Sequence, residues 1–532
     1  MSSHHLPVLQ LNVNGQQVEV ADDGSTLLDV LRDGLGVRTP KDGCSPQGQC
    51  GCCTVFIDGA ARVACVTPAR RVAGRSVVTL EGLPEPTTQR WAEAFSATGA
   101  SQCGFCTPGI IMRLEALRSK GIAADDVGAV ERALQAHLCR CTGWQTIVEA
   151  YQAFGDFTDS DTGLVVGRER SLEAASRRAT IEGGTTQVVG ADIVLGRAGF
   201  AADTVPDGAL IAVPDGTGGW SVGETLAEAR RRAGKVQGRR TTAESVLPIS
   251  LPVGDWVATL RTSWVEPAYL ETDAAWCEPD GEPASPLANG GAFGGKVHSP
   301  APEAARALSI AYGQPVLVLL SREDSVRLGP KRPPMAAGIR ADGTGVVVIA
   351  RTEGVADHIR SIAPLLEVIE VDVPGPPTSM ASRAVGWAEV VLLNEAANPT
   401  AIGSPIRVQG STGAFAEADI TPDGVVHVRV SCGDPLDEIV LRSYVIGAAH
   451  MAIGWVTSES LTVDEVGEIH DLTIRSFGVL RAVDMPHVAV NIEMSASEPK
   501  NGSDAAFVAV AAAVWRHQGF PPQLPTAIRL RS

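Results

Sequence analysis

Gln-Cys-Gly-Phe-Cys-Thr-Pro-Gly at residues 102–109 and Cys-Arg-Cys-Thr-Gly-Trp at residues 139–144 enclose two helical patterns. Pro108 can open the first helix, because its missing N–H and fixed φ suit the first helical position, and apolar residues then recur on one face. Asp125 or Asp126 begins the second helix, whose apolar residues also share one side. An antiparallel pair of helices would return the second cysteine pair to the first. This stretch therefore predicts that four thiols meet at one point.

The four thiols belong to Cys103, Cys106, Cys139 and Cys141. Four converging thiolates suit either a [2Fe-2S] cluster or a structural zinc ion. Since a cluster binds two thiolates on each iron, the Cys-x-x-Cys pair and the Cys-x-Cys pair would serve one iron each. Zinc ribbons more often repeat the Cys-x-x-Cys pair. The spacing favours the cluster, and zinc, disulfides or buried thiols are the alternatives.

Residues 102–109 together with 139–144 resemble the helical [2Fe-2S] domain of the molybdenum hydroxylases, the family of xanthine dehydrogenase and aldehyde oxidoreductase. The resemblance implies that the four thiols bind a [2Fe-2S] cluster. It also implies that Gln102 and Cys141 lie close to a molybdopterin cofactor. We therefore expect an oxidoreductase of the xanthine dehydrogenase family.

The composition of the chain indicates the compartment in which it works and excludes some classes of binding partner. The 532 residues suggest three or four domains, and 44% apolar residues can form large cores. The formal net charge of -17 argues against binding to nucleic acid or to a membrane surface, because phosphates would be repelled. There is no signal-peptide pattern and no apolar run long enough to span a membrane, so we expect a cytoplasmic protein without a membrane span. Nine of the eleven cysteines lie within the first 141 residues, which is typical of metal ligation in a reducing compartment.

A hairpin opens the chain. Residues 8–20 alternate apolar and polar side chains around Asn14 and Gly15, the pair that a two-residue type I′ turn favours. Ser25 can cap a short helix after it. Residues 41–55 then form a glycine-rich loop with four cysteines, and such a loop can point backbone N–H groups at the sulfide of an inorganic core.

A second hairpin brings a further cysteine to this loop. Strand residues 55–57 reach a turn at Asp58 and Gly59, and the returning strand ends at Cys65. That register places Cys65 near Cys53. A local hairpin is therefore enough to bring Cys65 to the loop as a further candidate ligand.

The pattern is similar to the plant-type ferredoxin domain, a β-grasp fold at the head of the same family. The usual spacing is Cys-x4-Cys-x2-Cys followed by a later cysteine, whereas five residues separate the first two cysteines here. The resemblance implies that a second [2Fe-2S] cluster is bound by Cys44, Cys50, Cys53 and Cys65. It leaves Cys52 as a cysteine that does not bind iron.

The expected fold class is α+β multidomain. Pro84 opens the join between the two iron-sulfur domains, and a run rich in Gly, Asp, Ser, Thr and Arg after Gly155 is typical of a linker. The expected parts are a β-grasp ferredoxin domain at 1–84, a four-helix [2Fe-2S] domain at 85–156, a linker at 157–185, and a shortened α+β molybdopterin-binding-like domain at 186–532.

Segments of the C-terminal part resemble pieces of the family's molybdopterin-binding region. Residues 290–296 resemble the glycine-rich loop that approaches the molybdenum cofactor, which implies cofactor contacts from Ala292, Phe293 and Gly294. By itself, a glycine run is more often a turn. Asp504 stands where the family carries a catalytic glutamate, so the resemblance makes it the candidate base.

These features give three hypotheses for function. The first is an electron-transfer component with two [2Fe-2S] clusters, which passes electrons from molybdopterin toward flavin or another acceptor and works with separate molybdenum-binding or FAD-binding subunits. The second is a self-sufficient molybdenum enzyme that oxidises an aldehyde or N-heterocycle through residues 292–294 and Asp504. The third is a scaffold whose C-terminal half binds partners. The resemblance implies a small-molecule substrate for the complex, with FAD only on a partner chain.

Overall fold

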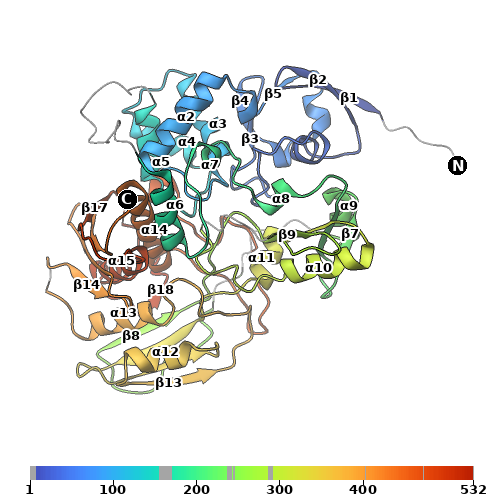
Figure 1. The fold of residues 1–532 in the computed structure, drawn as a ribbon. Coiled ribbons are helices and arrows are strands. Elements are labelled where there is room, and N and C mark those ends of the chain that lie inside the picture. The colour runs from blue at the N-terminus through green and yellow to red at the C-terminus, as the bar shows by residue number, and fades with distance from the viewer. Residues whose placement is uncertain are drawn as a thin grey trace.

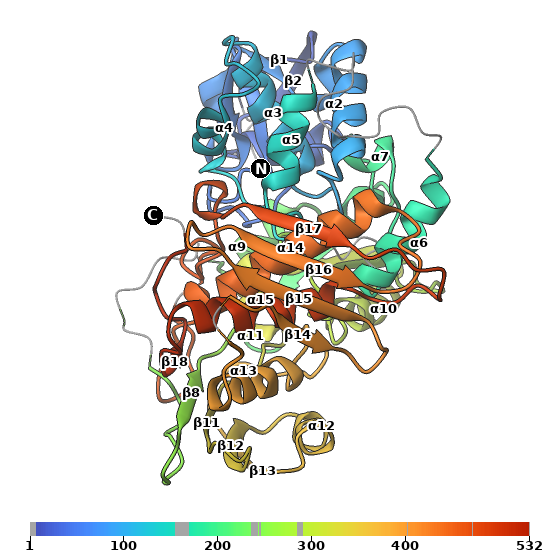
Figure 2. The ribbon, with the colours of Figure 1, turned by 90° about the vertical axis from the view of Figure 1, so that its left-hand side faces the viewer.

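A computed structural model describes residues 7–154, 170–235, 243, 246–284, 291–401, 403–470 and 472–530. The N-terminal residues up to 154 form one end of the molecule, and the C-terminal region with its three sheets lies beneath them (Figure 1). In the view turned by 90°, helix α14, Glu438–Thr457, runs directly under the N-terminal domains (Figure 2). The C-terminal region therefore packs against one side of the cysteine-rich domains.

A five-stranded sheet and a short helix form the first domain. The strand order is β2-β1-β5-β3-β4, with β1 and β5 parallel and both hairpins antiparallel. Asn14 (φ 52°) and Gly15 (φ 83°) make the predicted first turn, and Asp58 and Gly59 make the second. The elements are β1 Val8–Val13, β2 Gln16–Ala21, α1 Leu27–Asp29, η1 Val30–Gly34, β3 Thr54–Ile57, β4 Ala60–Val63, η2 Ala64–Val66, η3 Ala69–Val72, β5 Ser76–Val78 and η4 Leu80–Gly82.

Thr26 caps the first helix, so the prediction of Ser25 as the cap is wrong. The Thr26 hydroxyl accepts a hydrogen bond from the N–H of Asp29 at 3.2 Å, and the Asp29 carboxylate accepts from the N–H of Thr26 at 3.0 Å. The carboxylate three residues after Thr26 completes this reciprocal pair. It decides which of two neighbouring hydroxyl residues becomes the cap.

Four helices form the second domain, as the sequence predicts. Asp126 caps α4, because its carboxylate accepts from the N–H of Ala129 at 2.9 Å. Trp91 fills the centre, with its ring centroid 4.2 Å from that of Phe154 and its indole N–H donating to Glu115 at 3.0 Å. The helices are α2 Glu85–Thr98, α3 Thr107–Arg118, α4 Val127–Leu134 and α5 Gln145–Ala153.

The predicted linker at 157–185 is wrong in its second half, and residues up to 169 lie outside the described residues. Helix α6, Leu172–Gly183, packs on α14. Arg178 and Glu182 are fully buried in it and paired at 2.9 Å, and Glu182 also accepts from the N–H of Ser503 at 2.8 Å. The charged residues of this segment therefore form a buried ion pair, which also bonds to backbone groups far along the chain.

Three sheets with their helices form the C-terminal region. The strand orders are β7-β6-β10-β9, β13-β12-β11-β8-β18 and β14-β15-β16-β17. The strands are β6 Leu210–Pro214, β7 Trp220–Gly223, β8 Ala258–Thr262, β9 Ala274–Cys277, β10 Val316–Leu319, β11 Met335–Ile339, β12 Gly345–Ala350, β13 Leu366–Val371, β14 Ile406–Gln409, β15 Phe415–Ile420, β16 Val426–Ser431, β17 Val488–Ile492 and β18 Gln523–Leu524. The further helices are α7 Ala191–Val194, α8 Ala201–Thr204, α9 Leu226–Arg232, α10 Ala301–Tyr312, α11 Arg322–Leu328, α12 Val355–Ile362, α13 Trp387–Ala397, η5 Ala482–Asp484 and α15 Ser503–His517.

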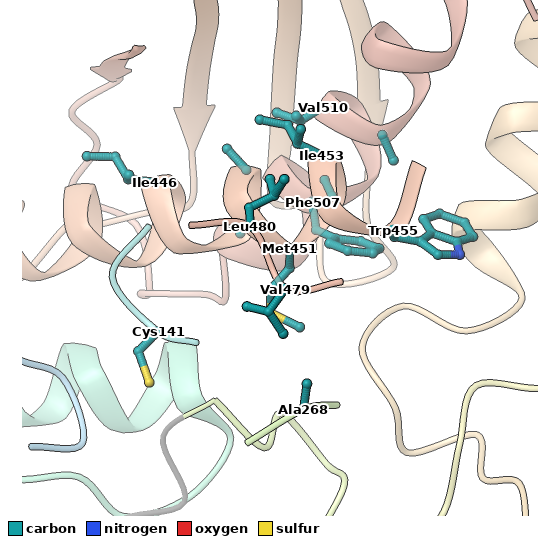
Figure 3. Packing of buried hydrophobic residues seen from close by; sticks show 14 of the residues in the cluster. Cys141, Ala268, Ile446, Met451, Ile453, Trp455, Val479, Leu480, Phe507 and Val510 are labelled. Carbon is teal, nitrogen blue, oxygen red and sulfur yellow. The ribbon is translucent and has the colours of Figure 1, made fainter. Parts of the chain in front are cut away.

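The largest core is built around α14 and α15. Trp455 of α14 stacks on Phe507 of α15 with ring centroids 5.7 Å apart. Figure 3 shows Cys141 of the helical domain below α14, and this cysteine belongs to the same buried cluster as Met451. The helical domain and the C-terminal region therefore share one core.

Helix α14 is long and apolar enough to cross a membrane when only length and composition are considered. Within the molecule, 89% of its most apolar stretch is buried. In this structure the helix is thus a core element.

Candidate metal centres

The thiols of the ferredoxin domain form one buried group. The Cys44 thiol contacts the thiols of Cys50 and Cys65, and Cys65 also contacts Cys53. All are free thiols, and none is more than 2% exposed. Hydrogen bonds from Cys50 and Cys65 hold the pKa of the Cys44 thiol well below its usual range. Buried thiols in mutual contact suit a metal centre, whose positive charge favours the thiolate form that metal ligation needs.

The loop around Cys44 directs backbone donors at its sulfur. The N–H of Gln47 lies 3.3 Å and the N–H of Gln49 lies 3.4 Å from Cys44 Sγ. Gly48 has a φ of 69°, which lets the chain fold back over the sulfur. The geometry agrees with the predicted N–H donors, which stabilise a thiolate or an iron-bound sulfur.

Cys52 lies at the edge of this group. Its thiol contacts the thiol of Cys50 and points toward the carbonyl oxygen of Cys50 at 3.9 Å. Cys50 has Cys44 as its other thiol partner. The four predicted ligands thus form a continuous set, and Cys52 adjoins it on the side of Cys50.

The thiols of the helical domain form a second group. Cys103 Sγ lies 3.7 Å from Cys141 Sγ, and the thiols of Cys106 and Cys139 contact each other. Two sulfurs on one tetrahedral metal at about 2.3 Å lie about 3.8 Å apart, so each contact suits a shared iron. The thiols of Cys139 and Cys141 also contact each other, so the four sulfurs form a continuous chain in the order Cys106, Cys139, Cys141, Cys103. The assignment of each sequence pair to one iron stays a prediction.

In the described part of the chain, no group of three or more Cys, His, Asp or Glu side chains is arranged to hold a single metal ion. A [2Fe-2S] centre spreads four sulfurs over two irons. In both groups the four predicted ligands form a continuous chain of thiol contacts, which suits two adjacent irons.

One hydrogen bond joins the two thiol groups. The N–H of Leu138, the residue before Cys139, donates to the carbonyl oxygen of Cys50 at 2.9 Å. The backbones approach closely, since a Cβ on Gly109 would lie 2.4 Å from the carbonyl oxygen of Gly51. The two groups thus sit back to back, with the backbones of their loops in direct contact.

Gln102 and the glycine-rich loop lie on either side of Cys141. The Gln102 amide donates to the carbonyl oxygen of Cys141 at 3.0 Å, while its Oε1 is buried and has no hydrogen-bond partner among the described residues. On the other side, a Cβ on Gly291 would lie 3.3 Å from Cys141 Sγ. The predicted loop does approach this cysteine, although Gly290 lies outside the described residues.

The rest of that loop packs against protein. A Cβ on Gly294 would lie 1.7 Å from the carbonyl oxygen of Ala381, and the centroid of the Phe293 ring lies 3.9 Å from the guanidinium carbon of Arg383. Ala292 and Phe293 line a cavity of about 40 Å³. The glycines here permit close protein contacts.

Asp504 is held by a guanidinium. Its Oδ1 accepts from Arg383 Nε at 2.8 Å, and the Arg383 side chain is 2% exposed whereas that of Asp504 is 41% exposed. A carboxylate bound in this way is oriented toward Arg383. Arg383 contacts both Asp504 and Phe293, so it links Asp504 to the loop of residues 292–294. The sequence pattern did not indicate Arg383.

Arg140, between two predicted ligands, was also missed. It pairs with Glu459, its NH2 lying 2.8 Å from Oε2, and its Nε donates to the carbonyl oxygen of Pro267 at 2.8 Å. Both side chains of the pair are at most 3% exposed. The sequence showed only that a charged residue stands between two cysteines predicted to be buried. It could not show the partner of Arg140, because Glu459 lies 319 residues away.

Burial makes one histidine a determinant of acid stability. His450 is fully buried, its Nε2 lies 3.0 Å from the carbonyl oxygen of Leu480, and desolvation lowers its pKa from 6.5 to about 4. Below about pH 6.5 the unfolded chain binds a proton that the folded chain excludes, so stability falls by about 1.4 kcal/mol per pH unit until the folded pKa is reached. The buried His137, whose pKa burial lowers to about 3, adds a contribution of the same sign. We expect chemical denaturation between pH 7 and 4.5 to show both contributions, and His450→Gln to reduce the slope by that of His450. The exposed His427→Gln variant is the control, and equal slopes in all three proteins would contradict the prediction.

Comparisons with known proteins agree with the two thiol groups. A 2Fe-2S iron-sulfur cluster binding domain model matches residues 10–70, and a [2Fe-2S] binding domain model matches residues 79–152. The nicotine 6-hydroxylase small subunit of Paenarthrobacter nicotinovorans is 42% identical over 143 residues, which are 27% of this chain and 86% of that protein. The nicotinate dehydrogenase small FeS subunit of Eubacterium barkeri is 37% identical over 138 residues, which are 26% of this chain and 87% of that protein.

The chain belongs to the molybdenum hydroxylase family. It is an oxidoreductase component with two [2Fe-2S] binding domains, which confirms the resemblance and sets aside the zinc alternative. The aldehyde oxidoreductase of Desulfovibrio gigas has a similar fold, with a TM-score of 0.67 and 14% identity, covering 96% of this chain and 97% of that chain. The α+β multidomain architecture of this family member is thereby confirmed as well.

Proposed function

We propose that this chain is an electron-transfer component of a molybdenum hydroxylase complex. Two [2Fe-2S] clusters would supply one-electron redox chemistry, and the chain's own residues hold them back to back. The observation that carries the proposal is the hydrogen bond of 2.9 Å from the Leu138 N–H to the Cys50 carbonyl oxygen, which joins the two thiol groups. The proposed ligands are Cys44, Cys50, Cys53 and Cys65 in one group, and Cys103, Cys106, Cys139 and Cys141 in the other.

A molybdopterin cofactor does not fit the cavities beside Gln102 and beside the described residues of the predicted cofactor loop. Cofactor sites are usually cavities of about 300–1,000 Å³. The cavity beside Ala292 and Phe293 holds about 40 Å³, and the one beside Gln102 about 20 Å³. Asp504, the proposed base, is bound to Arg383. We therefore assign the molybdenum site to a separate chain and FAD to another partner, with the small-molecule substrate bound away from this chain.

One observation favours the second hypothesis, a self-sufficient molybdenum enzyme. Gln102 Oε1 is buried without a hydrogen-bond partner among the described residues, and it lies beside Cys141. A bound pterin could satisfy such an acceptor. In that case the loop of residues 292–294 would have to open.

Metal analysis of the purified chain tests both hypotheses. We expect about four irons per chain, two electron paramagnetic resonance signals after reduction, and no molybdenum. About one molybdenum per chain would overturn the proposal in favour of the self-sufficient enzyme. Zinc in place of iron would contradict both hypotheses, because each depends on [2Fe-2S] clusters.

Partner capture tests the remaining parts of the proposal. We place the protein in the cytoplasm and divide it into domains at 1–84, 85–156 and 186–532, the last a shortened molybdopterin-binding-like domain. Purification from the native host should yield a complex that contains molybdenum and flavin. Recovery of partners without either cofactor would favour the scaffold hypothesis.

A further inference from the structure

Helix α14 forms one wall of the helical-domain thiol group. Ile439, Ser443 and Gly447 are spaced four residues apart, so they lie along one face of the helix. A Cβ on Gly99 would lie 3.0 Å from the carbonyl oxygen of Ile439 and 3.0 Å from the Ser443 Cβ. The helix therefore approaches this domain at backbone distance over two turns.

The closest approach is at the Cys141 peptide. A Cβ on Gly447 would lie 1.8 Å from the carbonyl oxygen of Cys141, and a Cβ on Gly143 would lie 2.7 Å from the carbonyl oxygen of Ile446. These atoms are backbone, so they cannot move aside as a flexible side chain can. The glycine at 447 thus fixes where the Cys141 peptide can lie.

A hydrogen-bond chain that starts on the same face of α14 holds the same peptide. Ser443 Oγ donates to the carbonyl oxygen of Gly99 at 2.7 Å and accepts from Gln102 Nε2 at 3.0 Å. Gln102 Nε2 also donates to the carbonyl oxygen of Cys141 at 3.0 Å. The side chains of Ser443, Gln102 and Cys141 are buried, so water cannot replace these contacts.

We propose that α14 is a positioning element that sets the reduction potential of the helical-domain cluster alone, through Gly447 and Ser443. An amide donor at a ligand peptide offsets the negative charge that a cluster gains on reduction, and a displaced ligand loses that donor. The contacts described above all fall on the helical domain, and none of them involves a thiol of the ferredoxin domain. This inference rests on the proposed cluster assignment.

Potentiometric titration of the full chain tests the inference, with each cluster followed by its own resonance signal. Ser443→Ala removes one acceptor and leaves the glycine packing intact, so this variant should fold. We expect its helical-domain cluster to titrate at a more negative potential, while the ferredoxin-domain cluster titrates as in the unchanged protein. Gly447→Ala should shift the same cluster further and alter its signal.

Gly128→Ala is the matched control for Gly447→Ala. Gly128 lies within helix α4 of the same domain, and the nearest atom to a Cβ there is the end of the flexible Arg132 side chain, at 3.0 Å. This control should leave both potentials unchanged.

Three outcomes are distinguishable. Equal shifts of both clusters, or no shift in Ser443→Ala with four irons retained, would overturn the inference. If the protein without any substitution does not contain two clusters, the proposed function itself is contradicted. If Gly447→Ala fails to fold, Ser443→Ala decides alone.

Discussion

The Cys106→Ser variant is expected to lose the helical-domain cluster and to keep the ferredoxin-domain cluster. Cys106 contacts Cys139 within the proposed ligand group, and the serine hydroxyl would be a far weaker ligand than the thiolate. Iron should fall from about four to about two per chain, and one of the two resonance signals should disappear. Iron analysis and spectroscopy of the reduced protein measure both effects.

Two further variants make this result specific. Cys53→Ser should remove the other signal and keep the helical-domain signal, since Cys53 belongs to the group with Cys65. Cys52→Ser is the matched control, because its neighbour Cys50 has another thiol partner in Cys44. Full iron in Cys106→Ser would contradict the ligand assignment, and loss of iron in Cys52→Ser would make Cys52 a ligand.

The sequence was sufficient wherever structure depends on neighbours along the chain. The turns at Asn14 and Gly15 and at Asp58 and Gly59 follow from two residues each, and the second turn fixes the register that brings Cys65 to the loop. The helix pair between the cysteine motifs is similarly local. The convergence of each thiol group could therefore be predicted, and the family models over residues 10–70 and 79–152 agree with it.

Prediction ended where distant segments decide the outcome. The pairing of Cys103 with Cys141 depends on how the two segments face each other, which spacing alone does not specify. Helix α6 lies in a run that was predicted to be a linker because it is rich in Gly, Asp, Ser, Thr and Arg. Yet its Arg178 and Glu182 are buried and bonded to backbone groups more than 250 residues away. The pairing of Asp504 with Arg383 likewise joins two segments that no local pattern connects.

Replacing Arg140 with methionine is expected to destabilise the whole protein strongly. Glu459 would then be a fully buried carboxylate without its guanidinium, and breaking a buried pair by removing one partner costs about 3–5 kcal/mol. Burial already raises the pKa of Glu459, so the variant should take up a proton at this carboxylate. The midpoint of denaturant unfolding should fall accordingly.

The double variant Arg140→Met with Glu459→Leu separates charge from packing. Replacing both partners of a buried pair by apolar residues is often nearly neutral, because no unpaired charge remains. We therefore expect it to recover most of the lost stability, although the bond from Arg140 to the Pro267 carbonyl oxygen is still missing. If the double variant is as unstable as Arg140→Met, the destabilisation comes from lost contacts of Arg140 itself. Recovery of stability together with four irons would mean that the ion pair specifies the docking of the ligand loop without being needed to hold the cluster.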